Sequence, residues 1–196
     1  MRDVFVDDAF EITMSATVVA DLKLEVDTQW TSKIDDHATA IAASEDARQI
    51  ALSLISRRMW GCNELKRRLV KRGIDQTIAL VVTEQLVDDG WLNDLEYACA
   101  LIRQWISKEP AGRRWLRHKL REKQIPSDIG INAIEVELGD RSEQESATLF
   151  ASIRLSKLDG LDVEVATRRV RAALGRRGFE AYIATDAIRS AQADGA

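Results

Sequence analysis

Basic side chains recur at three places in the chain, each time among regularly spaced apolar residues. The first set is Lys66, Arg67, Lys71 and Arg72. The second is Arg113, Arg114, Arg117, Arg121 and Lys123, and the third is Arg168, Arg169, Arg171, Arg176 and Arg177. Guanidinium and ammonium groups bind anions, whether phosphates or carboxylates. These residues are therefore the candidate partner-binding set, and a solvated helix surface without any partner is the alternative interpretation.

Residues for other kinds of chemistry are scarce. The two histidines, His37 and His118, are far apart and belong to no motif with metal-ligand spacing. Cys62 and Cys99 match neither a disulfide framework nor a zinc site, so we interpret them as reduced, partly buried small hydrophobic residues. Glycine-rich phosphate loops are missing as well. The sequence therefore predicts no metal, no cofactor, no covalent intermediate and no enzymatic activity.

Charge is distributed unevenly along the 196 residues. Residues 1–46 carry 3 basic and 11 acidic side chains, whereas residues 47–125 carry 16 basic and 9 acidic ones. The cationic middle favours an anionic partner. No stretch approaches the roughly 20 apolar residues that span a bilayer, and the first residues lack the layout of a secretion signal. We therefore expect a cytoplasmic protein without a membrane partner.

The basic sets lie in a unit that the chain repeats three times, at offsets of 51 and 54 residues. Leu65, Leu116 and Val170 share one position of this unit, and Leu69, Leu120 and Leu174 share the next apolar position. The stop position is shared by Gly73, Gln124 and Gly178. Units that cannot bury an apolar face alone stack on their neighbours, so the repeat predicts a row of similar modules.

Each unit is expected to contain three helices. In the first unit, apolar spacing of three and four residues predicts one helix from Ala47 to Ile55 and a second around Leu65 and Leu69. Gly73 suits a left-handed helix end, and Asp75 can cap the third helix, which ends before Gly90. With ten glycines and only two prolines, the composition also favours helix.

The predicted fold is all-α, with three tandem three-helix repeats at residues 47–93, 94–140 and 141–196 that form an elongated, curved body. An acidic extension, residues 1–46, precedes them. Within it, residues 4–8 and 10–12 predict a short hairpin around an Asp-Asp-Ala turn, and residues 16–24 predict a short helix.

The tryptophans at repeat junctions and in helix stripes, Trp91, Trp105 and Trp115, are expected to pack in the core. Trp60 differs because it lies in a polar loop, residues 58–63, beside Arg58. An exposed tryptophan beside an arginine is a common binding anchor, so Trp60 joins the candidate partner-binding residues.

Three ordered motifs resemble the RecX family of regulatory proteins. Residues 56–73 contain Ser-Arg-Arg, then Glu-Leu-x-x-Arg-Leu, then Lys-Arg-Gly, which is similar to the first repeat of that family. Residues 89–98 read Asp-Gly-Trp-Leu-Asn-Asp followed by Tyr-Ala, and residues 176–179 read Arg-Arg-Gly-Phe, similar to its later hallmarks. The resemblance covers roughly residues 47–190.

The resemblance implies a non-enzymatic regulator of the RecA recombinase in DNA repair and the SOS response. Members of the family bind the RecA filament on DNA, lie along its groove, and restrain filament growth, ATP hydrolysis and strand exchange. The basic faces are then the expected contact with the filament, with direct DNA contact as a further option, and we expect a monomer. Two alternatives remain open: a DNA-binding helical module, and a helical-repeat scaffold for another protein.

Overall fold

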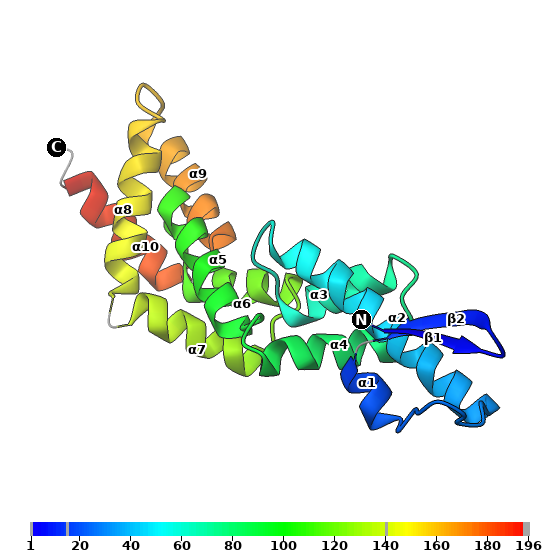
Figure 1. The fold of residues 1–196 in the computed structure, drawn as a ribbon. Coiled ribbons are helices and arrows are strands. Elements are labelled where there is room, and N and C mark those ends of the chain that lie inside the picture. The colour runs from blue at the N-terminus through cyan, green and yellow to red at the C-terminus, as the bar shows by residue number, and fades with distance from the viewer. Residues whose placement is uncertain (1, 15, 140, 194–196) are drawn as a thin grey trace. The chain divides into compact units, whose positions relative to one another are not determined.

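The computed structural model describes residues 2–14, 16–139 and 141–193, through which run two strands and ten helices (Figure 1). The chain forms two compact units, Met1–Leu92 and Asn93–Ala196. The predicted fold class is confirmed, because the chain is mostly helical and begins with a small two-stranded hairpin. The elongated outline and the division at residues 46, 93 and 140 stay predictions.

The expected hairpin and short helix are both present at the start of the first unit. Strands β1 (Arg2–Val6) and β2 (Ala9–Met14) pair antiparallel and are joined by Asp7 and Asp8. These two aspartates have φ angles of 49° and 64°, a left-handed conformation that short polar side chains tolerate. Helix α1 (Ala16–Asp21) follows the hairpin.

The first long helix begins much earlier than its apolar pattern predicts. The sequence placed its start at Ala47, but α2 (Ser32–Ile55) begins fifteen residues before that position. Thr31 caps this end, because its side chain accepts a hydrogen bond from the backbone N–H of Ile34. The hairpin packs against this helix through β2, and Met14 of β2 and Ala38 of the early part of α2 are both buried. Tertiary packing therefore extends the helix.

Two shorter helices complete the first unit, α3 (Cys62–Val70) and α4 (Gln76–Asp88). Leu65 and Leu69 of α3 are fully buried against α2 and α4. The predicted cap is confirmed, because the Asp75 carboxylate accepts hydrogen bonds from the first backbone N–H groups of α4.

The second unit contains six helices: α5 (Asp94–Lys108), α6 (Arg113–Glu122), α7 (Ser127–Leu138), α8 (Glu143–Ser156), α9 (Val163–Arg176) and α10 (Ala181–Ala193). Helices α5, α6 and α7 enclose one apolar core, which contains Leu116 and Leu120. Helices α8, α9 and α10 enclose another, which contains Val170 and Leu174.

The backbone confirms the internal register of the three motifs. Gly73, Gln124 and Gly178 all adopt positive φ angles, of 90°, 61° and 84°. In each case the residue lies two or three positions after the last residue of the middle helix of its group. Gln124 thus takes the left-handed conformation without being glycine, because its position in the repeat requires the same turn. The sequence offsets of 51 and 54 residues therefore superimpose equivalent structural positions.

Candidate functional site

Helix α6 presents basic side chains on the face opposite its buried leucines. Arg114, Arg117 and Arg121 are exposed, whereas Leu116 and Leu120 lie in the core. The three arginines are three and four residues apart, so they lie within about 10 Å of one another along the axis at a rise of roughly 1.5 Å per residue. The sequence pattern predicted this outward placement, and the structure confirms it.

Helix α9 likewise exposes basic side chains while its apolar side chains are buried. Val170 and Leu174 are buried, and the exposed side chains include Arg168, Arg169, Arg171 and Arg176. Arg176 occupies the last turn of the helix. It therefore stands where α9 meets the start of α6.

The start of α6 is docked on the end of α9 by backbone contacts. The Gly112 N–H donates a hydrogen bond of 2.9 Å to the carbonyl of Arg177. A Cβ on Gly112 would lie 2.5 Å from the carbonyl oxygen of Gly178, and a Cβ on Gly178 would lie 2.4 Å from the amide nitrogen of Trp115. Only glycine allows this approach at both positions. We call this contact of Gly112 with Arg177 and Gly178 the joint. It places the exposed arginines of α6 beside Arg176.

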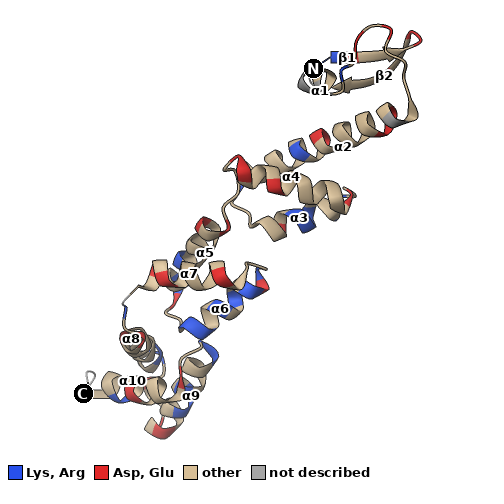
Figure 2. Ribbon diagram, turned by 90° about the horizontal axis from the view of Figure 1, so that it is seen from below, with Lys and Arg blue, Asp and Glu red and all other residues tan. Residues whose placement is uncertain are grey.

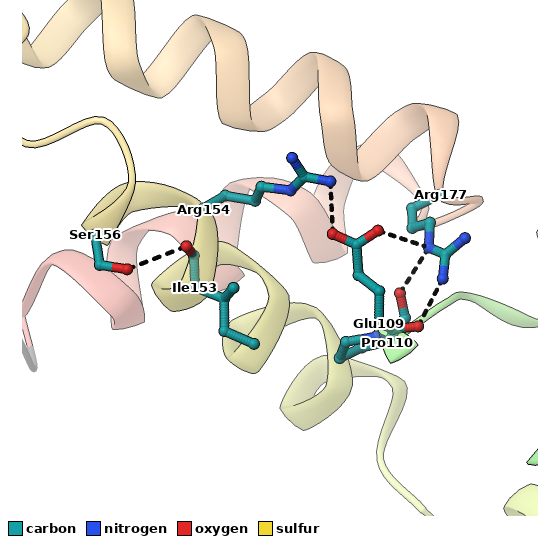
Figure 3. A network of polar contacts seen from close by, with 6 residues as sticks. All are labelled: Glu109, Pro110, Ile153, Arg154, Ser156 and Arg177. Carbon is teal, nitrogen blue, oxygen red and sulfur yellow. Dashed lines mark hydrogen bonds and ion pairs between the residues drawn. The ribbon is translucent and has the colours of Figure 1, made fainter. Parts of the chain in front are cut away.

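Arg177 strengthens the joint from inside (Figure 3). Its guanidinium donates to the carbonyls of Pro110 and Glu109 at 3.0 and 2.6 Å, and it lies 4.1 Å from the centre of the Trp115 ring. The Glu109 carboxylate lies between Arg177 and Arg154 and is paired with both. Burial lowers the pKa of Arg177 from its usual value, and Glu109 opposes that shift.

The joint creates a cationic groove between α6 and α9. An open hollow of about 470 Å³ is lined by four arginines, Arg114, Arg117, Arg121 and Arg176, together with His118. None of its described lining residues is Asp or Glu, although a carboxylate oxygen of Glu122 lies 3.0 Å from Nε2 of His118. Figure 2 shows the concentration of basic residues on α6. We call this hollow the α6–α9 groove.

A second hollow, of about 300 Å³, adjoins the groove through Arg176 and lies between α8 and α9. Its basic residues are Arg154, Lys157, Arg169 and Arg176, and its floor includes Leu158 and Val170. Arg176 therefore lines both hollows. Arginines can bind phosphates or carboxylates with two parallel hydrogen bonds, so this continuous surface is suited to an extended anion.

The first unit carries a smaller basic surface on α3. Arg67, Lys71 and Arg72 are exposed, and Lys66 is half-buried. A hollow of about 400 Å³ brings Arg67 and Lys71 together with Trp60.

Trp60 itself is not the exposed anchor that its loop position suggested. The ring is half-buried, and its Nε1–H donates to the carbonyl of Leu54 at 3.0 Å. The Arg58 guanidinium lies 3.4 Å from the ring centre and pairs with Glu64. These contacts give Trp60 an internal role, and its contact with a partner stays a prediction.

Other candidate residues also have internal contacts. Arg113 pairs with Glu135 and donates to the carbonyl of Gly139, and Arg177 forms the joint. Lys123 is half-buried at the end of α6. Sequence reasoning missed His118, which lines the α6–α9 groove, and Arg154 and Lys157, which line the second hollow. No pattern along the chain marks them, because they join the basic surface only through the packing of α6, α8 and α9.

Sequence reasoning also expected Trp91 to be core, whereas 57% of its surface is exposed. Cys99 is buried as expected, and burial raises the pKa of its thiol, which keeps it protonated. Among the described residues there is no group of His, Cys, Asp and Glu that could hold a metal ion, and no helix that could span a membrane.

Comparison of the chain with known proteins identifies its family. The model of the second three-helix domain of RecX matches residues 93–130, which contain α5 and α6. The regulatory protein RecX of Corynebacterium efficiens is 30% identical over 152 residues, covering 74% of this chain and 71% of that protein. The chain belongs to the RecX family. The RecX protein of Mycolicibacterium smegmatis is 29% identical over 149 residues and matches 74% of this chain and 78% of its own length.

Solved RecX structures share the fold. One crystal structure of regulatory protein RecX superimposes with a TM-score of 0.82 at 16% identity, over 96% of this chain and 92% of that one. RecX from Lactobacillus salivarius gives a TM-score of 0.67 at 18% identity, over 78% of this chain and 98% of that one. The RecX family consists of regulatory proteins by name, so the groove belongs to a regulatory protein.

Proposed function

We propose that this protein binds the RecA recombinase filament on DNA and restrains its growth, its ATP hydrolysis and its strand exchange. The observation that carries the proposal is the α6–α9 groove, whose arginines are held side by side by the Gly112 joint in a member of the RecX family. A filament of recombinase and DNA is polyanionic, so an arginine-lined groove is attracted to it.

The proposal assigns no catalytic step to this chain. Binding along the filament restrains it by blocking the addition of subunits and by holding bound subunits in one state. ATP hydrolysis belongs to the recombinase, and it changes only because the filament changes. We propose that the protein acts in the cytoplasm as a monomer.

Titration against three targets tests the proposal. The chain is labelled with a fluorophore and its anisotropy is measured with bare single-stranded DNA, with RecA alone, and with the RecA filament on that DNA. The proposal expects tightest binding to the filament, together with a falling rate of DNA-dependent ATP hydrolysis at the same protein concentrations. Equal rates with and without the protein would contradict it.

A DNA-binding helical module is the second candidate. The absence of Asp and Glu from the described lining of the groove favours it, since phosphates would meet the four arginines without a carboxylate in the lining. Equal affinity for bare DNA and for the filament would support this candidate against the first. Binding to none of the three targets would favour a scaffold for another protein.

A further inference from the structure

Two phenylalanines lie exposed on one face of the hairpin in the first unit. Phe5 and Phe10 are 60% and 57% exposed, and their ring centres are 5.9 Å apart in an edge-to-face arrangement. Large apolar side chains that stay in water while forming a contiguous pair indicate an interaction surface.

A β-bulge is what puts both rings on the same face. Val4 pairs with Ile12, but the register then shifts by one residue, so that Phe5 pairs with Phe10 and Glu11 is the extra residue. Without the bulge, strict alternation in β2 would turn Phe10 to the same side as Ile12 and Met14. That side is the covered one, since Met14 is 1% exposed and β2 packs on α2. The irregular register therefore exposes an aromatic side chain that regular pairing would have directed inward.

Acidic side chains surround the aromatic pair. Asp7 and Asp8 form the adjacent turn, Glu11 is the bulged residue, and all three are exposed. Within the described residues none of the three has an ion pair. Figure 2 shows the acidic residues of this hairpin. Residues 1–46 as a whole carry 11 acidic and 3 basic side chains, which disfavours approach of a nucleic acid.

We propose that the outward face of the β1–β2 hairpin is a docking surface for a protein surface that carries lysine or arginine side chains on an apolar patch. Ring faces attract cations, and the nearby carboxylates complete the neutralisation of those cations. The identity of the partner rests on the proposed function, so this basic surface belongs to the recombinase. The cationic groove and the acidic hairpin then contact chemically opposite parts of the filament.

The test uses the full chain and the RecA filament on single-stranded DNA. Affinity is measured by biolayer interferometry for the wild type and for the double variant Phe5→Ser/Phe10→Ser. Because both rings are exposed and outside the buried cores, the helices should stay folded in this variant, which circular dichroism and thermal unfolding check. We expect its affinity for the filament to be at least tenfold weaker.

Two further variants separate the contributions. Phe5→Leu/Phe10→Leu keeps the apolar surface and removes the rings, and its affinity should fall between those of the wild type and the serine variant. The triple variant Asp7→Asn/Asp8→Asn/Glu11→Gln removes the charges while asparagine tolerates the left-handed turn. It should bind severalfold more weakly at low salt and with a smaller loss at high salt. The matched control is Tyr182→Ser/Val136→Ser, which removes exposed apolar surface from the second unit and should bind like the wild type.

Each contrary outcome has a distinct meaning. If the wild type binds the filament and the serine variant binds equally well, the inference is wrong and the proposed function stands. If the wild type does not bind the filament, both fail. If the serine variant also binds bare DNA more weakly than the wild type does, the hairpin contacts nucleic acid and not a basic protein surface. If the wild type self-associates in analytical ultracentrifugation and the serine variant does not, the hairpin binds a second copy of this chain and not the recombinase.

Discussion

Gly112 and Gly178 face each other so closely that a Cβ on Gly112 would lie 2.5 Å from the Gly178 carbonyl oxygen. This approach brings the first turn of α6 against the last turn of α9. The α6–α9 groove exists because of it, since Arg114 and Arg117 come from one helix and Arg176 from the other.

Replacement of Gly112 by alanine should therefore destabilise the second unit. The added methyl group meets backbone atoms that cannot move aside, and overpacking of this kind costs about 1 to 3 kcal/mol. Gly175→Ala is the matched control, because a Cβ at that position in α9 has open space around it. The control should be neutral or stabilising by up to about 1 kcal/mol, since alanine favours helix over glycine. Urea unfolding of both variants measures the difference, and equal stabilities would contradict the joint.

Glu109→Gln should loosen the same joint. Its carboxylate pairs with both Arg154 and Arg177, and the glutamate side chain is 26% exposed. We expect a loss of about 1 to 2 kcal/mol, between the values typical of exposed and of buried ion pairs. Glu135→Gln, which removes the more exposed pair with Arg113, should cost less. A smaller effect at Glu109 than at Glu135 in chemical denaturation would oppose this ranking.

Asp75 predicts a pH-dependent step in the stability of the first unit. Hydrogen bonds from the backbone N–H groups of Thr77 and Ile78 lower the pKa of Asp75 below its ordinary value of 3.8. A lowered folded-state pKa stabilises the fold above the unfolded-state pKa, and that contribution disappears as the pH falls through the folded-state pKa. Asp75→Asn keeps an acceptor but loses the charge. Its melting temperature should differ from the wild type by a constant amount above about pH 4, and by a shrinking amount below it.

Charge reversal in the α6–α9 groove should weaken binding to the filament. Arg117→Glu/Arg121→Glu places two carboxylates where an anion would lie, so we expect a loss of tenfold or more in affinity and a smaller dependence on salt. Lys108→Glu/Arg141→Glu makes the same change of net charge at exposed positions outside the groove and should have little effect. Equal losses for the two double variants would mean that only net charge matters.

The basic surface of α3 should contribute through many weak attractions. Reversal of Lys66, Arg67, Lys71 and Arg72 to glutamate should weaken filament binding severely, whereas each single change should be mild. Helicity should persist, because these side chains lie off the stripe of Leu65 and Leu69. Circular dichroism checks the fold and the recombinase ATPase assay checks the function. If the quadruple variant restrains RecA as well as the wild type does, α3 is not part of the interface. If the affinity does not depend on salt, apolar contacts hold the complex instead.

Local sequence patterns predicted the buried sides of the repeat helices and the cap at Asp75, but not the early start of α2 at Ser32. The spacing of apolar residues predicted which side of α3, α6 and α9 is buried, because a helix of 3.6 residues per turn puts such residues on one face. Repetition also aligned Gln124 with Gly73 and Gly178 at the stop position, and the structure gives all three a positive φ, although a glutamine by itself gives no signal for one.

Which basic side chains stay available for a partner was decided by tertiary structure alone. Arg176 and Arg177 are neighbours with the same chemistry, yet Arg176 lines the groove while Arg177 is held by the carbonyls of Glu109 and Pro110, more than sixty residues away. The exposure of Phe10 likewise depends on a register shift against β1. Amino-acid type and the helical period determine which face of a helix a residue occupies. Its hydrogen bonds, ion pairs and burial depend on atoms from segments far away in the sequence, and no local pattern specifies how close those atoms come.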